Sequence, residues 1–189
     1  FLNAVDNPHN GLTFCAGSLS AGEHNDTREL AKKFAKRTHF VHLRSTAAMP
    51  GGNFIESSHL TGRGHLIDLI RIFEKENPGL PMRVDHGRMM LGDEDKGYNP
   101  GYSFHGRMLA LAQVEGMMAV VMADKLRAVF GNRVLGPDKP PVARIQTLFI
   151  KKIVVKIEQN APMGRARELL LRIQREMIED ERYKSLIVY

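Results

Sequence analysis

The stretch HFVHLRST, residues 39–46, places His42 and then Arg44 directly after a short apolar run. The stretch PMRVDHG, residues 81–87, repeats the pattern, because an apolar run again leads into a polar residue, here Asp85. A short apolar run bounded by polar or turn residues is typical of a buried strand. Two predicted strands therefore end in side chains of the kind that bind metal ions and move protons.

Helical patterns alternate with strand patterns along this part of the chain. Residues 25–37 and 65–76 are rich in helix formers, and the second stretch carries apolar residues on one helical face. A further strand is expected at 11–17, and 104–130 is predicted to be one long helix or two helices broken near Gly116. Strands and helices in alternation indicate an α/β fold whose strands are parallel and joined by crossovers.

In parallel α/β folds, functional residues gather at the carboxyl ends of the strands. Cys15, His42 and Asp85 fall at that position in three predicted strands, so we expect them to share one pocket. A thiolate, an imidazole and a carboxylate suit a transition metal of intermediate softness. Zinc is the commonest ion for such ligands, and iron(II) or manganese is also chemically reasonable. The structural alternative is a cysteine that is a small buried hydrophobe and a histidine that only makes a hydrogen bond.

The composition is typical of a globular protein, with 43% hydrophobic and 25% charged residues. No run of 18 apolar residues and no signal peptide is visible, so no membrane contact is expected. The single cysteine excludes a disulfide within the chain and favours a reducing, cytoplasmic location. The net charge of +6 lies mostly in residues 135–189 and forms no basic block with interleaved aromatics, so nucleic-acid binding is not expected.

The composition changes at residues 131–141, which are rich in glycine and proline and are predicted to be a linker. We expect a first domain over residues 1–130 and a separate strand–helix–strand segment over 142–189. The three elements predicted in that segment are 147–157, 164–183 and 185–189.

Five ordered blocks of sequence resemble the mannonate dehydratase family over about residues 6–130. The blocks are NGLTFCAGS (10–18), HFVHLRST (39–46), NFIESSHLTG (53–62), PMRVDHG (81–87) and NPGYSFHGR (99–107). The resemblance implies an α/β fold that is the C-terminal part of a TIM (β/α)8 barrel, followed by the extra strand–helix–strand segment. It also implies the removal of water from D-mannonate to give 2-keto-3-deoxy-D-gluconate in hexuronate breakdown, with Mn2+ or Fe2+ as cofactor.

Matched by motif, Cys15, His42 and Asp85 stand at the positions of three metal ligands of the family. His86 and Tyr102 stand at the positions that the family uses as acid and base. These residue types suit a dehydration, because a base must take the proton from C2 and an acid must help the hydroxyl at C3 leave. Histidine is poised for either role near neutral pH, and tyrosine is the better proton donor.

The resemblance also implies four residues in contact with the substrate. Arg44 would hold the substrate carboxylate by a bidentate contact. Asn10, His59 and Arg107 lie in the matched blocks as further substrate-binding residues. One local departure follows the HLTG motif, where the family usually continues with an acidic residue and residues 63–65 of this chain read RGH.

A complete (β/α)8 barrel has eight strands in about 250 residues, whereas only three or four strands are predicted before the linker. The family's fourth metal ligand is a histidine from the first half of the barrel, and no sequence block that matches its motif precedes Cys15. Part of a barrel leaves open sheet edges that favour pairing with another chain, so a homo-oligomer is expected. The alternative function is therefore that of a catalytically incomplete module that acts in assembly.

Overall fold

The computed structural model describes residues 1–97, 99, 101–145 and 148–179. The chain divides into two compact units, Phe1–Glu115 and Gly116–Tyr189. All the candidate site residues fall in the first unit. A domain boundary at a linker over 131–141 stays a prediction.

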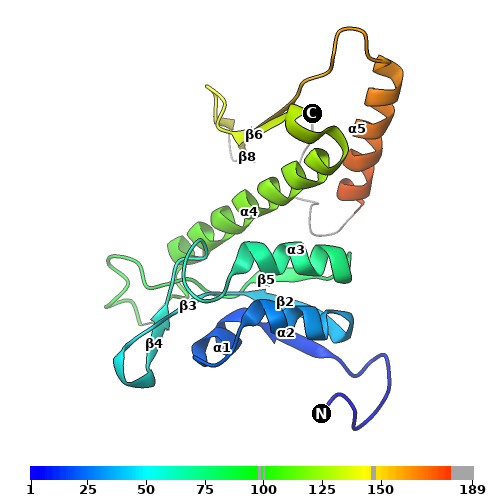
Figure 1. The fold of residues 1–189 in the computed structure, drawn as a ribbon. Coiled ribbons are helices and arrows are strands. Elements are labelled where there is room, and N and C mark those ends of the chain that lie inside the picture. The colour runs from blue at the N-terminus through cyan, green and yellow to red at the C-terminus, as the bar shows by residue number, and fades with distance from the viewer. Residues whose placement is uncertain (98, 100, 146–147, 180–189) are drawn as a thin grey trace. The chain divides into compact units, whose positions relative to one another are not determined.

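A parallel sheet forms the centre of the first unit (Figure 1). Its strands are β1 (Leu12–Cys15), β2 (Thr38–Leu43) and β5 (Met82–Val84), in the order β1-β2-β5. Both strand pairs are parallel, which confirms the predicted α/β fold with parallel strands. The described residues form a three-stranded sheet here and no closed barrel.

Three helices accompany these strands. Helix α1 (Ala16–Ala21) follows β1 directly, α2 (Thr27–Phe34) precedes β2, and α3 (Leu66–Glu76) precedes β5. Helices α2 and α3 occupy the stretches predicted to be helical at 25–37 and 65–76. Helix α1 was not predicted, because its six residues are too few for a helical period to be visible in the sequence.

The helices form where the sequence supplies a start signal and an apolar face. The Asp26 side chain accepts a hydrogen bond from the backbone N–H of Arg28 at 2.9 Å, which satisfies one of the free donors at the start of α2. In α3, the predicted apolar face is confirmed, because all four of its residues are buried. They are Leu66, Leu69, Ile70 and Phe73.

One face of the sheet packs against this helical layer. Phe14 of β1 meets Phe73 of α3 edge-on, with ring centroids 5.2 Å apart, and both side chains are buried. Val41 and Leu43 of β2 are buried as well. Full burial of one such side chain stabilises the fold by roughly 1.5–3 kcal/mol. Helices α2 and α3 lie side by side (Figure 1).

A short antiparallel hairpin follows β2 and was not among the predicted elements. Its strands are β3 (Thr46–Ala48) and β4 (Phe54–Glu56), and the turn between them contains Gly51 with a φ of +76°. Glycine adopts this conformation without a steric penalty. Three residues a strand are too few for an alternating pattern to show in the sequence. Thr46 pairs with Glu56, which brings the Glu56 side chain beside the end of β2.

Helix α4 (Phe104–Phe130) runs from the first unit into the second as one continuous helix, so the alternative of two helices broken near Gly116 is wrong. The remaining elements of the second unit are short strands and one helix. They are β6 (Val134–Asp138), β7 (Arg144–Ile145), β8 (Leu148–Phe149), β9 (Lys152–Val155) and α5 (Met163–Ile178).

The pairing of these strands corrects one prediction. Strand β6 pairs with β9 and β7 pairs with β8, both antiparallel. The single strand predicted at 147–157 is therefore wrong in extent, because that stretch contains two short strands that belong to different pairs. Strand β6 forms inside the stretch predicted to be a linker. The predicted strand at 185–189 and the last residues of the helix predicted at 164–183 lie outside the described residues.

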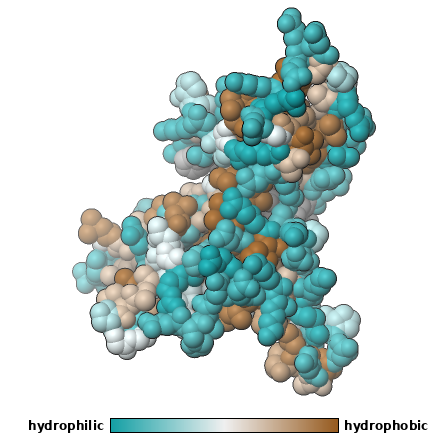
Figure 2. Space-filling model, viewed as in Figure 1, coloured by the Kyte–Doolittle hydropathy of each residue, from teal (hydrophilic) through white to brown (hydrophobic). Residues whose placement is uncertain are grey.

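One described helical stretch, Phe104–Arg133, is long and apolar enough to cross a membrane by length and composition alone. In its most apolar window of 18 residues, 44% of the residues are buried, as in the core helix of a globular protein. The visible face of the molecule is mainly hydrophilic, with apolar residues between the polar ones (Figure 2). The expectation that the chain has no membrane contact remains a prediction.

Candidate metal centre

The three predicted ligands lie at the carboxyl ends of adjacent strands. Cys15 is the last residue of β1 and pairs in register with His42 of β2. Asp85 follows β5 directly, and its backbone N–H approaches the carbonyl oxygen of Leu43 at 3.5 Å. The predicted convergence of the three side chains is therefore confirmed, whereas their binding of a metal stays a prediction.

The local fold explains why these side chains share one face of the sheet. Successive residues of a strand point to opposite faces. Phe14 and Val41 face the helical layer, so their neighbours Cys15 and His42 point to the other face. Arg83 pairs with His42 and stands two residues before Asp85, which puts both of them on that face as well.

The ligand atoms are close enough to face one ion. Cys15 Sγ, a ring nitrogen of His42 and a carboxylate oxygen of Asp85 all lie within 4.8 Å of one another, and each residue is partly buried. His42 Nδ1 is 3.9 Å from Asp85 Oδ2. Ligand atoms at roughly 2.0–2.3 Å from one ion stand about 3–4 Å apart. Small side-chain rotations are therefore enough to turn this cluster into a coordination shell.

Two neighbouring polar groups hold the anionic ligands. The Ser18 hydroxyl donates a hydrogen bond to Cys15 Sγ at 3.2 Å, and such a bond orients the sulfur atom. Arg83 Nη2 donates to Asp85 Oδ1 at 3.3 Å. The other oxygen of this carboxylate, Oδ2, is the one that faces His42.

The His42 imidazole favours its neutral form. Burial lowers the pKa of His42, and the nearby Asp85 carboxylate opposes that shift. The ring is also fixed by packing, because Phe40 meets it edge-on with centroids 5.2 Å apart. A neutral imidazole is the form that binds a metal, so the environment of His42 suits the role of a ligand.

Arg44 lies between two carboxylates. Its Nε is 3.2 Å from Glu56 Oε2, and its Nη1 is 3.6 Å from Asp85 Oδ2. Burial raises the pKa of Glu56, and the positive charge of Arg44 opposes that rise. The guanidinium rests on Gly17 of α1, where an added Cβ would lie 2.7 Å from Arg44 Cζ. Gly17 therefore leaves the space that the Arg44 side chain fills.

His86 and Tyr102 pack against each other beside the cluster. Their rings stack with centroids 4.6 Å apart and an angle of 25° between the ring planes. His86 is 7% exposed and Tyr102 is 42% exposed, so the imidazole is buried under a phenol that reaches solvent. His86 Nε2 lies 3.7 Å from Asp85 Oδ2, which places the predicted acid–base pair next to the predicted ligands.

Close contact between two loops positions this pair. The N–H of Gly87 donates to the carbonyl oxygen of Gly101 at 3.1 Å. Gly101 has a φ of +84°, and a Cβ at this position would lie 3.3 Å from His86 Nδ1. A side chain at position 101 would therefore strain the backbone and crowd the His86 ring.

Two of the predicted substrate-binding residues differ in their relation to the site. Arg107 places its guanidinium carbon 5.2 Å from the centre of the Tyr102 ring, at the edge of the acid–base pair. His59 is only 2% exposed, and its Nε2 donates to the carbonyl oxygen of Leu43 at 2.8 Å. Its contacts are those of a buried structural histidine.

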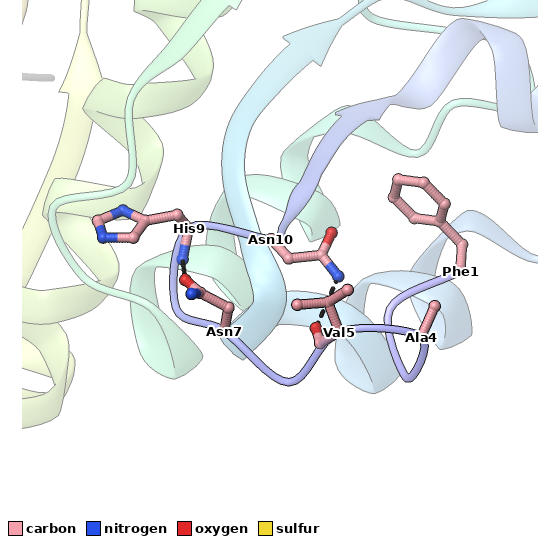
Figure 3. Close-up of a pocket in the computed structure, with 6 residues that line it drawn as sticks. All are labelled: Phe1, Ala4, Val5, Asn7, His9 and Asn10. Carbon is pink, nitrogen blue, oxygen red and sulfur yellow. Dashed lines mark hydrogen bonds between the residues drawn. The ribbon is translucent and has the colours of Figure 1, made fainter.

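Asn10 does not join the cluster, because it precedes β1 and the cluster lies at the other end of that strand. Its side-chain amide donates to the carbonyl oxygens of Leu2 at 3.3 Å and Val5 at 2.9 Å. Figure 3 shows this amide among the N-terminal residues that line a shallow pocket. The expected substrate contact of Asn10 stays a prediction.

Sequence reasoning missed three residues of the site: Ser18, Glu56 and Arg83. Ser18 lies three residues after Cys15 at the start of a helix, and Arg83 lies two residues before Asp85 on the same strand face. Both spacings are signals that could have found them. Glu56 reaches the site through the hairpin, for which the sequence offered no such signal.

Comparisons with known proteins show which family this part of the chain resembles. Residues 1–128 match the family model described as D-mannonate dehydratase (UxuA). Mannonate dehydratase 2 of Agrobacterium fabrum is 38% identical over 129 residues, which are 64% of this chain and 32% of that protein. Mannonate dehydratase of Saccharophagus degradans is 41% identical over 128 residues, which are 62% of this chain and 32% of that protein.

A solved structure adds a match in three dimensions. The crystal structure of mannonate dehydratase from Streptococcus suis superimposes with a TM-score of 0.59 at 29% sequence identity. The match covers 66% of this chain and 36% of that one. The chain therefore spans about a third of the length of the relatives it matches.

Proposed function

We infer the function from the family, because this chain belongs to the D-mannonate dehydratase (UxuA) family over residues 1–128. We propose that it supplies the metal-binding part of an enzyme that dehydrates D-mannonate to 2-keto-3-deoxy-D-gluconate. The observation that carries the proposal is the convergence of Cys15, His42 and Asp85 at three adjacent strand ends inside the matched region. The parallel sheet would then be part of the C-terminal half of a TIM barrel, where catalytic residues gather at this end of the strands.

The donor set fits a divalent transition metal, and Mn2+ or Fe2+ is the proposed ion. Cys15 would bind as a thiolate supported by Ser18, and Asp85 would bind through Oδ2 while Arg83 holds Oδ1. When bound, the ion would supply positive charge that stabilises the negative charge developing on the substrate carboxylate.

The acid–base work falls to His86 and Tyr102. His86 takes the proton from C2. The electrons of the broken C2–H bond then form a double bond between C2 and C3. The C3–O bond breaks, and the hydroxyl leaves as water with a proton from the Tyr102 phenol. The resulting enol then converts to the 2-keto acid. The stacked rings support this division, because the base is buried beside the proposed ligands and the donor reaches solvent.

A second candidate function is that of an assembly module. It is favoured by one observation: among the described residues, β1 and β5 each have only one neighbouring strand in the sheet. Such edges can pair with another chain. The two functions differ in metal binding, because an assembly module needs no intact Cys15–His42–Asp85 cluster. A chain that binds no divalent metal would favour the assembly function.

Metal titration of two matched variants tests the proposed function. Asp85→Asn removes an anionic ligand and should weaken Mn2+ or Co2+ binding by about tenfold or more. Asp68→Asn is the control, because Asp68 is a half-exposed carboxylate on α3 that forms an ion pair with Arg71. It should bind the metal like the unchanged chain.

Isothermal titration calorimetry gives the affinities, and circular dichroism shows whether each variant is folded. Equal loss of affinity in both variants would mean that the effect is one of general charge. Full metal affinity in a folded Asp85→Asn variant would show that Asp85 is not a ligand.

A further inference from the structure

The contact between Arg44 and His86 determines which ring nitrogen of His86 carries the proton. Arg44 Nη1 lies 3.1 Å from His86 Nε2, which is hydrogen-bond distance. A guanidinium only donates hydrogen bonds and has no acceptor. His86 Nε2 must therefore accept, because two donors cannot face each other at this distance.

The other side of the ring leads to the same conclusion independently. His86 Nδ1 faces two oxygen atoms, the carbonyl oxygen of Gly87 at 3.4 Å and Glu56 Oε2 at 3.9 Å. Both are acceptors, so this side of the ring favours an N–H group. Asp85 Oδ2 also lies 3.7 Å from Nε2, but this is beyond hydrogen-bond distance, whereas the Arg44 donor lies within it. The nearest contact at each nitrogen, a donor at Nε2 and an acceptor at Nδ1, therefore selects the same neutral tautomer.

Arg44 keeps this orientation because it is held at several points. Glu56 Oε2 lies 3.2 Å from its Nε, and Asp85 Oδ2 lies 3.6 Å from its Nη1. Gly17 leaves room for the guanidinium, and the Arg44 side chain is only 13% exposed. The Glu56 carboxylate thus serves twice, since it faces both Arg44 and the Nδ1 side of His86.

We propose that Arg44 and Glu56 are positioning residues that hold His86 as the tautomer with its proton on Nδ1 and its lone pair on Nε2. The inference rests on the proposed function only in its consequence, which is that Nε2 is the nitrogen that would accept the substrate proton. It also changes the role expected of Arg44. A bidentate grip on a substrate carboxylate would require Arg44 to leave both Glu56 and His86.

Nitrogen-15 NMR of the metal-free 189-residue chain tests the proposal. Long-range proton–nitrogen spectra distinguish the two neutral tautomers of a histidine ring. The chain has eight histidines, so a His86→Gln variant identifies the His86 signals by their loss. Spectra are recorded at about pH 8.5, roughly two units above the ordinary histidine pKa. We expect the unchanged chain to show His86 with its proton on Nδ1.

Two arginine variants separate the specific contact from general charge. Arg44→Met removes the donor to Nε2 and should shift the His86 signals toward the tautomer with its proton on Nε2. Arg83→Met is the matched control, because Arg83 also donates to Asp85 but, within the described part of the chain, makes no hydrogen bond or ion pair with His86. It should leave the His86 signals unchanged.

A proton on Nε2 in the unchanged chain would overturn the proposal, and this result does not depend on the folding of either arginine variant. Equal shifts in Arg44→Met and Arg83→Met would overturn it as well. The outcome is separate from the proposed function, because the spectra need neither metal nor substrate. A correct tautomer together with failed metal binding would count against the dehydratase function alone.

Discussion

Replacing Gly17 by alanine probes the Arg44 contacts with a single methyl group. Gly17 lies in α1, and a Cβ at this position would lie 2.7 Å from Arg44 Cζ and 2.8 Å from Arg44 Cδ. Real Cβ atoms do not approach other atoms so closely, so the Arg44 side chain must move. The matched control is Gly116→Ala in helix α4, where no atom lies within 4 Å of the added Cβ.

The structure gives opposite signs for the two substitutions. Alanine is favoured over glycine inside a helix by about 0.5–1 kcal/mol, so Gly116→Ala should raise the free energy of unfolding by that amount. In Gly17→Ala, the replacement of glycine by alanine inside a helix stabilises the fold by the same amount at most. It also displaces Arg44, which leaves Glu56, only 21% exposed, without its cation. An unpaired polar group costs about 1–3 kcal/mol when it is fully buried, and Glu56 is only partly buried, so the net change for Gly17→Ala should be a loss of no more than about 2 kcal/mol.

Urea denaturation of both variants measures these changes, and the His86 signals in nitrogen-15 spectra report on Arg44 directly. We expect Gly17→Ala to be less stable than Gly116→Ala and to shift the His86 signals, whereas Gly116→Ala leaves them unchanged. If Gly17→Ala is as stable as Gly116→Ala and has an unchanged His86 spectrum, then Arg44 is not confined as the structure indicates.

Two further predictions concern acid stability and association. Burial lowers the pKa of His59, so below about pH 6.5 this histidine binds fewer protons in the folded chain than in the unfolded one. The free energy of unfolding should therefore fall as the pH decreases. His59→Gln, whose amide can still donate to Leu43, should reduce this fall, as measured by urea denaturation between about pH 7.5 and 5.5. The open edges of β1 and β5 and the exposed Phe104 (73%) and Met108 (45%) should drive self-association, and a monomeric mass in analytical ultracentrifugation would contradict that.

The parallel sheet and the convergence of three ligands were predictable because both follow from local patterns. Short apolar runs alternating with helical stretches indicate parallel strands, and parallel strands bring their carboxyl ends to one edge. Cys15, His42 and Asp85 stand at those ends, so their convergence needed no knowledge of side-chain packing. The apolar face of α3 was predictable for the same reason, because the helical period alone defines it.

The surroundings of the cluster were not predictable, because they depend on contacts between segments far apart in sequence. Glu56 reaches Arg44 only after β3 and β4 pair in a specific register. His59 is drawn into a hydrogen bond with a backbone carbonyl of β2, and Asn10 into a loop at the opposite end of β1. A matching motif indicates the type of residue at a position, but the direction of its side chain is decided by packing.

The charges around the cluster bear on which substrates this arrangement suits. Arg44 and Arg83 stand against the carboxylates of Asp85 and Glu56, so the site without metal has two cations facing two anions. A divalent ion bound with Cys15 as thiolate would leave one net positive charge. A substrate that carries one carboxylate would neutralise it, whereas a neutral sugar would leave it uncompensated in a partly buried site. The charge balance of these residues is therefore consistent with the proposed substrate class, a sugar acid.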